Sequence, residues 1–239
     1  MKFNYNNPAW LQGAGRSGKA NTLFYITSLI DNNEIVFANT KLGVFADNVQ
    51  YSTDNAVTWE QLSDDLTITL NKGETVYFRN ETGQVYSSAM SNKIVTTSGE
   101  YSVGGDITAL FYRGVALPIY AFKEAFKGDE FIVDASALVL KSKTLAKYCY
   151  NSMFSGCTGL TAAPELPATA LAEYCYSSMF YGCTGLSEIT CLAESTANSA
   201  TESWLDGVTE TGTFTQAAGA DFWEDGASGI PTGWTVIEQ

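Results

Sequence analysis

A sixteen-residue segment that occurs twice constrains the fold of this chain more than any other feature. Residues 145–160 read LAKYCYNSMFSGCTGL and residues 171–186 read LAEYCYSSMFYGCTGL, so thirteen of sixteen positions are identical at an offset of 26 residues. A repeat of this length indicates a unit that cannot bury its hydrophobic face alone and does so by stacking on its neighbours. The sequence therefore predicts a stack of similar units in the C-terminal half.

The three differences between the copies fall at 147/173, 151/177 and 155/181, four residues apart each time. This spacing is typical of one helix face, and the variable face is expected to be exposed to solvent. Each unit is predicted to contain a helix, a Gly-Cys-Thr-Gly turn, a very short strand and a return segment with proline. Such a unit lies within the size range of leucine-rich repeats. The candidates for an exposed repeat face are Lys147, Asn151, Glu173, Ser177 and Tyr181.

Two units are too few for a stable stack, so the flanking segments are expected to complete it. Upstream, residues 120–128 match the unit loosely and predict a degenerate first unit. The repeats then cover residues 115–200, with units at about 119–144, 145–170 and 171–196. Residues 201–239 are expected to form a C-terminal cap, with a last helix over 201–208.

The N-terminal half shows the alternation of apolar and polar residues that is typical of strands. Residues 66–70 and 76–78, for example, alternate on either side of an Asn-Lys-Gly-Glu turn. Several such segments predict an antiparallel, immunoglobulin-like β-sandwich over residues 22–114. The predicted fold class is therefore a multi-domain α+β protein, in which the sandwich precedes a short leucine-rich-repeat solenoid and its cap.

Residues 1–21 do not share the strand pattern and are predicted to be an N-terminal arm. The arm carries Phe3, Tyr5 and Trp10 among polar residues and glycines, so it either tucks onto its own sandwich or docks on a partner. Residues 13–19 fit the spacing of a phosphate-binding loop. However, the next position is Ala20 where a hydroxyl would hold magnesium, and no buried strand precedes it. A flexible loop is the preferred interpretation.

The composition excludes several kinds of function. The chain has no histidine, which excludes a Ser-His-Asp or Cys-His relay, so we expect no enzyme activity, no catalytic residue and no cofactor. A net charge of −13 argues against nucleic acid as a partner. All thirteen basic residues lie within 1–147, whereas 148–239 carry eleven acidic residues and no basic one. The longest apolar stretch, 23–30, is too short for insertion into a membrane.

The five cysteines are predicted to be buried free thiols. They stand at 149, 157, 175, 183 and 191, too far apart for a C-x-x-C zinc site, and four of them are the repeat copied twice. We therefore expect no metal site, and we expect Cys157 and Cys183 to stack in adjacent turns.

The segment Tyr148–Ala172 resembles the BspA-like leucine-rich repeats of surface proteins from anaerobic gut bacteria and of virion proteins from their phages. Residues 51–59 look like the β-sandwich that often precedes those repeats, and residues 204–214 and 229–236 look like the family's C-terminal cap. The resemblance covers about residues 45–239, and residues 1–44 fall outside it. It implies adhesion or display, and it carries over no catalytic residue.

The function expected from this resemblance is that of a non-enzymatic structural or display protein of a phage virion: a head fibre, a capsid decoration or a tail-associated protein. The N-terminus shows no secretory signal, which favours a virion protein over a secreted adhesin. The arm would then dock to other virion proteins through Phe3, Tyr5 and Trp10, and the repeat face would contact a host glycan or protein. The alternative is a secreted or surface-anchored bacterial adhesin. A homo-oligomer is compatible with both.

Overall fold

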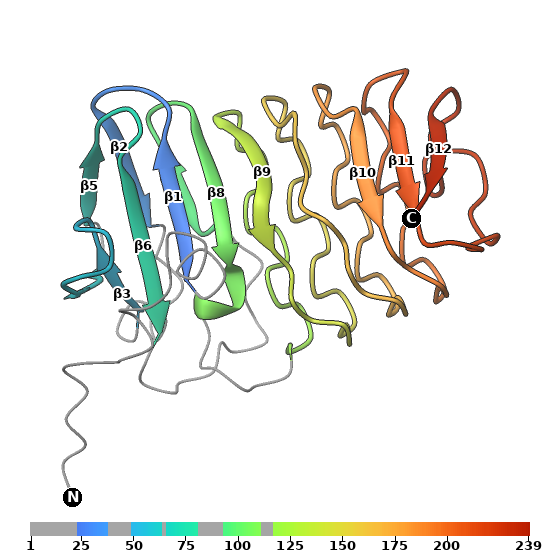
Figure 1. Ribbon diagram of the computed structural model, residues 1–239, viewed down its shortest axis with the longest axis horizontal. Coiled ribbons are helices and arrows are strands. Elements are labelled where there is room, and N and C mark those ends of the chain that lie inside the picture. Colours follow the sequence, from blue (N-terminus) through green and yellow to red (C-terminus); the bar gives the residue numbers. More distant parts are fainter. Residues whose placement is uncertain (1–22, 38–48, 64–65, 81–92, 111–116) are drawn as a thin grey trace, which may run out of the picture.

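Two sheets form the N-terminal half of the protein (Figure 1). The computed structural model describes residues 23–37, 49–63, 66–80, 93–110 and 117–239. A mixed sheet has the order β4-β3-β6-β1-β8-β9, and an antiparallel sheet has the order β5-β2-β7. Their elements are β1 (Phe24–Ser28), β2 (Asn33–Phe37), β3 (Val49–Ser52), β4 (Glu60–Gln61), β5 (Thr67–Leu70), β6 (Thr75–Asn80), β7 (Val95–Thr97), β8 (Tyr101–Asp106) and β9 (Ile132–Val139), with a 3-10 segment η2 (Ile107–Leu110) after β8.

The two sheets contact each other through aromatic side chains. Phe37 of β2 and Phe78 of β6 lie with ring centroids 5.0 Å apart across the two sheets. Phe24 of β1 extends this contact within the mixed sheet, 5.9 Å from Phe78. Residues alternate between buried and partly buried along β1 and β6, as expected for sheets that bury one face. Within the mixed sheet Gly104 pairs with Tyr25, and a Cβ at position 104 would lie only 2.3 Å from the Tyr25 ring. The glycine therefore leaves the space that the tyrosine ring occupies.

The predicted helices are absent from the described residues, so the α+β fold class is wrong. Residues 147–156 form consecutive turns instead, and so do the equivalent residues of the other copy and residues 201–208. Apart from η2, the described chain consists of strands, turns and irregular segments.

The backbone N–H groups of these turns alternate between two kinds of partner. Cys149 and Met153 donate to the carbonyl three residues earlier, which closes a local turn. Tyr150 and Phe154 donate instead to carbonyls of the next repeat, at 3.0 and 2.8 Å. Every second turn has a left-handed third residue, as in a type II turn; these residues are Tyr148 (φ 60°), Ser152 (φ 55°) and Gly156 (φ 76°). Along the segment, one N–H group therefore closes a turn and the next one bonds to the neighbouring repeat.

We call each of these segments a turn ribbon. The second turn ribbon covers residues 147–156, and the same pattern of hydrogen bonds and positive φ places the first at 119–128, the third at 173–182 and the fourth at 198–207. In the second ribbon the pairs Cys149–Tyr150 and Met153–Phe154 are buried, while the pairs at 147–148 and 151–152 face outward. Two residues in and two out give a period of four. This period is close to the 3.6 residues of a helix, which is why the spacing predicted the wrong element.

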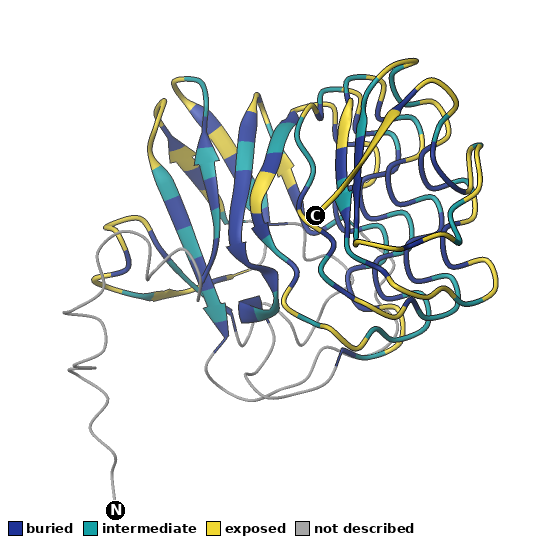
Figure 2. Cartoon of the chain, turned by 45° about the vertical axis from the view of Figure 1, so that its right-hand side comes forward, coloured by how far each residue is buried: buried dark blue, intermediate teal, exposed yellow. Residues whose placement is uncertain are grey.

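Equivalent side chains stack in columns through the repeats. The rings of Phe126, Phe154 and Phe180 lie parallel with centroids 5.2 and 5.6 Å apart. A second column contains Phe122, Tyr150, Tyr176, Trp204 and Trp223. Buried residues line the inside of the stack along its length (Figure 2).

One hydrophobic core runs through the sandwich and the stack. Strand β9 pairs in parallel with β8, and its Asp134 bridges to Ala162 of the following repeat, so the mixed sheet leads directly into the stack. The boundary predicted at 114/115 lies outside the described residues. At the other end a parallel sheet closes the chain, with strands β10 (Glu188–Cys191), β11 (Thr213–Gln216) and β12 (Thr235–Glu238).

A buried carboxylate joins the sandwich to the first repeat, and its hydrogen bonds are expected to contribute measurably to stability. Asp129 is 1% exposed and accepts the Tyr101 hydroxyl at 2.9 Å and the Lys93 ammonium at 3.3 Å. The substitution Tyr101→Phe is expected to lower the free energy of unfolding by about 1.5–3 kcal/mol, because the carboxylate loses a donor. Urea denaturation measures the change. Tyr77→Phe on β6 of the same sheet serves as the control. Equal midpoints for both variants would contradict the role assigned to Asp129.

Candidate functional site

The outward side of the turn ribbons contains four of the five residues that the sequence assigned to an exposed face. Tyr181 is 48% exposed, and Lys147, Asn151 and Glu173 are partly exposed. The prediction is wrong for Ser177, which is only 7% exposed. Its short side chain lies in a row between two larger residues, Asn151 in the ribbon before and Glu202 in the ribbon after, as the hydrogen-bond register shows.

Two of these predicted residues form an ion pair across neighbouring repeats. The Lys147 Nζ donates to the Glu173 carboxylate at 2.8 Å, and this hydrogen bond raises the pKa of Lys147. The two side chains are 42% and 45% exposed, so the pair contributes little to stability. Its effect is to hold both side chains in register on the surface.

A ladder of tyrosines lies beside this ion pair. The rings of Tyr120, Tyr148 and Tyr174 stack with centroids 5.0 and 4.8 Å apart and interplanar angles of 15° and 6°. Lys147 lies 5.2 Å from the Tyr148 ring centroid and 5.7 Å from that of Tyr174, within the range of cation–π contacts. The fourth ribbon carries Ser199 at the corresponding position, so the ladder ends at Tyr174. We call Tyr120, Tyr148 and Tyr174 the tyrosine ladder.

The tyrosine ladder was not among the residues predicted from the sequence. Its signal was present, because two of the tyrosines are identical in the two copies and Tyr120 begins the loosely matching segment. The helical interpretation, however, assigned only the variable positions to the surface and left these tyrosines unassigned. In a turn ribbon two adjacent residues face outward together, so the invariant Tyr148 lies beside the variable Lys147.

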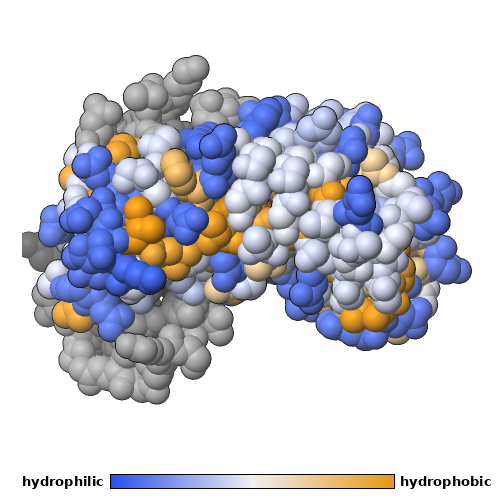
Figure 3. Space-filling view, turned by 90° about the horizontal axis from the view of Figure 1, so that it is seen from above, coloured by the Kyte–Doolittle hydropathy of each residue, from blue (hydrophilic) through white to orange (hydrophobic). Residues whose placement is uncertain are grey.

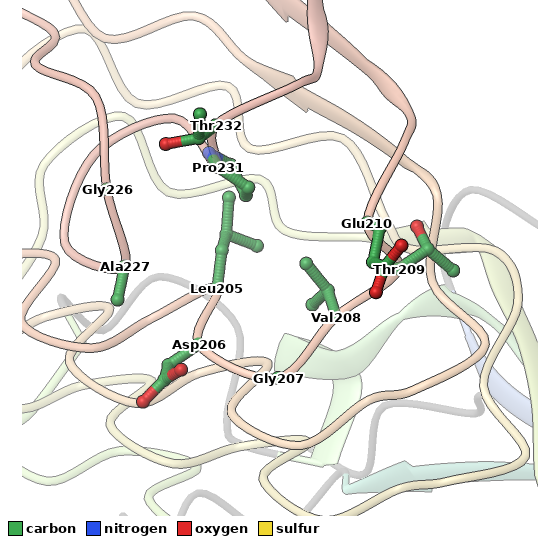
Figure 4. Close-up of a pocket in the computed structure, with 10 residues that line it drawn as sticks. All are labelled: Leu205, Asp206, Gly207, Val208, Thr209, Glu210, Gly226, Ala227, Pro231 and Thr232. Carbon is green, nitrogen blue, oxygen red and sulfur yellow. The ribbon is translucent and has the colours of Figure 1, made fainter.

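A pocket of about 220 Å³ opens where the fourth turn ribbon meets the C-terminal loops (Figure 4). The Leu205 and Val208 side chains lie in its middle, with the carboxylate of Asp206 on one side and that of Glu210 on the other. Gly226, Ala227, Pro231 and Thr232 line the opposite wall. The sequence does not predict this pocket, because its two walls are about twenty residues apart along the chain and no motif links them.

The five cysteines are buried and free, which confirms that prediction. The thiols of Cys157 and Cys183 donate to the carbonyls of Phe126 and Phe154, in each case one repeat earlier, at 3.0 and 3.1 Å. Burial raises the pKa of Cys183 to about 12. These thiols are therefore packing groups and not nucleophiles. Within the described ranges, no group of three or more Cys, Asp or Glu side chains is placed to hold a metal ion.

Large hydrophobic side chains reach the surface in several separate elements. They include Phe131 just before β9, and Val236 and Ile237 on β12, at 40%, 45% and 47% exposure. Viewed from above, hydrophobic residues over the middle of the molecule are interrupted by hydrophilic ones (Figure 3). The part of the chain that the structure describes includes no helix long and apolar enough to span a membrane.

The arm candidates Phe3, Tyr5 and Trp10, and the glycine-rich segment 13–19, lie outside the described residues. The site that the described residues support is therefore the outward face of the turn ribbons, with the tyrosine ladder at one edge and the pocket beside the fourth ribbon. No protein-family model, curated protein or solved structure matches the chain.

Proposed function

We propose that the protein is a non-enzymatic display protein that binds a partner surface through the outward face of its turn ribbons. The single observation that carries the proposal is the tyrosine ladder. Three stacked rings hold a row of surface side chains at fixed spacing, and the ion pair between Lys147 and Glu173 lies against them.

The chemistry of this face fits recognition. Tyrosine offers a large amphipathic contact area and loses little side-chain entropy on binding, which is why it is enriched in binding surfaces. Here the entropy has largely been lost on folding, because each ring is already fixed by its neighbours. The backbone beneath is held by inter-repeat hydrogen bonds of 3.2 Å, from Tyr120 to Lys147 and from Tyr148 to Glu173. Such a preorganised face binds at lower cost than a mobile one.

The place of action that we propose is a phage virion, with the protein as a head fibre, a capsid decoration or a tail-associated protein. The support is the resemblance of Tyr148–Ala172 to the BspA-like repeats of such proteins. Other virion proteins would hold the N-terminal arm, and a host glycan or protein would contact the ladder. A bacterial surface or secreted adhesin remains the alternative, since the same face would serve it.

Particle location and binding are tested separately. Immunogold labelling and mass spectrometry of purified phage particles are expected to find the protein in stoichiometric amounts. Its absence from particles whose genome encodes it would refute the virion proposal in favour of the adhesin.

The binding face is tested with a variant that the fold itself suggests. Ser199 occupies the ladder position of the fourth ribbon with the same left-handed backbone, at φ 54°, as Tyr174 at φ 56°. The triple variant Tyr120→Ser, Tyr148→Ser, Tyr174→Ser should therefore keep the ribbon. We expect it to bind host cells at least tenfold more weakly than the wild type in flow cytometry. Thr184→Ser, an exposed position outside the turn ribbons, is the matched control. Equal binding by both variants would exclude the ladder as the binding face.

A further inference from the structure

The size of the pocket beside the fourth turn ribbon limits what it can hold. Its volume of about 220 Å³ is below the ~300–1,000 Å³ typical of sites for whole small molecules. It is several times the ~30 Å³ that one water molecule occupies. The space therefore matches a single long side chain better than a complete metabolite.

The lining of the pocket combines apolar walls with two carboxylates. Leu205, Val208, Ala227 and Pro231 supply the apolar surface, and the Asp206 and Glu210 side chains flank it on opposite sides (Figure 4). A lysine or arginine side chain has the matching construction, because an apolar stem carries a terminal cation with several donors. A neutral apolar side chain would gain no electrostatic attraction from the two exposed carboxylates.

The carboxylates of the pocket take part in none of the ion pairs found among the described residues. Residues 148–239 contain no lysine or arginine. The same region carries eleven acidic residues, so its field attracts cations from a distance. Charge complementarity therefore favours a basic partner.

The pocket is continuous with the outward face of the ribbons. The Gly182 N–H donates to the Asp206 carbonyl at 2.8 Å, which places Asp206 next to Tyr181 in the stack. Tyr181 is 48% exposed and offers a second contact, apolar or cation–π, to whatever enters the pocket. A chain segment that inserts one side chain beside Asp206 would thus also cover Tyr181.

We infer that this pocket binds a lysine or arginine side chain from a basic segment of a partner protein. The carboxylates of Asp206 and Glu210 at its edges attract the cation, and Tyr181 contacts the flanking residues. The inference names a partner chemistry for the display function and rests on that proposal. The pocket is tested with the free protein. A negative result there would not affect the test of particle location, and absence from the particles would not affect the pocket measurement.

The test is an NMR titration of the ¹⁵N-labelled full-length chain with the peptide acetyl-Gly-Ser-Arg-Ser-Gly-amide at low ionic strength. We expect saturable shifts at the amides of Gly207, Gly226 and Ala227, and the same set with lysine in place of arginine. The neutral citrulline peptide, which keeps the shape of arginine without its charge, is expected to bind at least tenfold more weakly.

Charge-removing variants complete the test. Asp206→Asn with Glu210→Gln is expected to weaken binding at least tenfold, whereas Glu188→Gln, an exposed acid on β10, should bind as the wild type does. The inference is overturned if the citrulline peptide binds equally or if the double variant keeps its affinity. It is also overturned if an uncharged sugar, methyl α-glucoside, gives the same shifts, because the pocket would then bind a glycan. It is also overturned if the pocket amides shift with protein concentration alone, since a second copy would then be the occupant.

Discussion

Raising the pH from 9 to about 10.5 is expected to unfold the protein. Burial raises the pKa of Cys175, Cys183 and Cys191 from 9.0 to about 12, and it raises those of Cys149 and Cys157 still further. A thiol whose pKa is raised by folding contributes its full stability below pH 9. That stability is lost as the pH rises toward the folded value, because the unfolded chain ionises first.

The size of this effect follows from the number of thiols. Each contributes ~1.4 kcal/mol per pH unit above 9, and five together lower the free energy of unfolding by ~7 kcal/mol per unit. The whole stability of a domain is about 5–15 kcal/mol, so it is exhausted within one or two units. Burial also raises the pKa of the Tyr150 and Tyr176 hydroxyls well above 10, which adds to the loss at higher pH.

Urea denaturation at several pH values between 8 and 10, under reducing conditions, measures the slope. The informative control is Cys191→Ala, since Cys191 is a free thiol that is fully buried. Its cavity lowers stability equally at every pH, but its slope should be smaller by ~1.4 kcal/mol per pH unit. A wild-type slope in this variant would show that the thiols are not the cause.

The repeat itself was readable from the sequence, because identity at a fixed offset requires equivalent environments. Stacking and buried thiols followed from it correctly. The element within the repeat did not, since two-in, two-out burial at 149–150 and 153–154 has nearly the period of a helix. The turn ribbon differs from a helix in the left-handed backbone of Tyr148 and Ser152. Tyrosine and serine rarely adopt this conformation, so the sequence gives no sign of it.

The binding face was predictable only in part. Variable positions such as Tyr181 indicate exposure, but the tyrosine ladder consists of invariant residues that a helical interpretation leaves unassigned. The pocket depends on where the loop at 226–232 returns to the fourth ribbon, and this is a tertiary contact without a local pattern. The wrong prediction for Ser177 has the same origin, because neighbouring repeats decide its exposure.

Replacing Trp204 by alanine is expected to lower the free energy of unfolding by about 3–5 kcal/mol. Trp204 is fully buried and lies between Tyr176 and Trp223, with ring centroids 6.4 and 5.4 Å away. It is the point at which the column of stacked rings passes from the repeats into the cap. Urea denaturation followed by circular dichroism measures the loss, and Val236→Ala, a 45% exposed position on β12, is expected to change stability by less than about 0.5 kcal/mol.

The residues around Trp204 cannot readily move in to fill the cavity that Trp204→Ala leaves, because their backbone atoms are already in close contact with one another. The indole Nε1 donates to the Gly229 carbonyl at 2.7 Å, and even a Cβ on Gly229 would meet the Glu224 carbonyl at 1.7 Å. Trp204→Phe keeps an aromatic ring at this position but loses the N–H donor. It is therefore expected to lower the free energy of unfolding by about 1–2 kcal/mol, less than Trp204→Ala does. Because one core joins the sandwich to the cap, the Trp204→Ala variant should unfold in a single transition at lower urea. Two separate transitions would mean that the cap folds independently of the stack it covers.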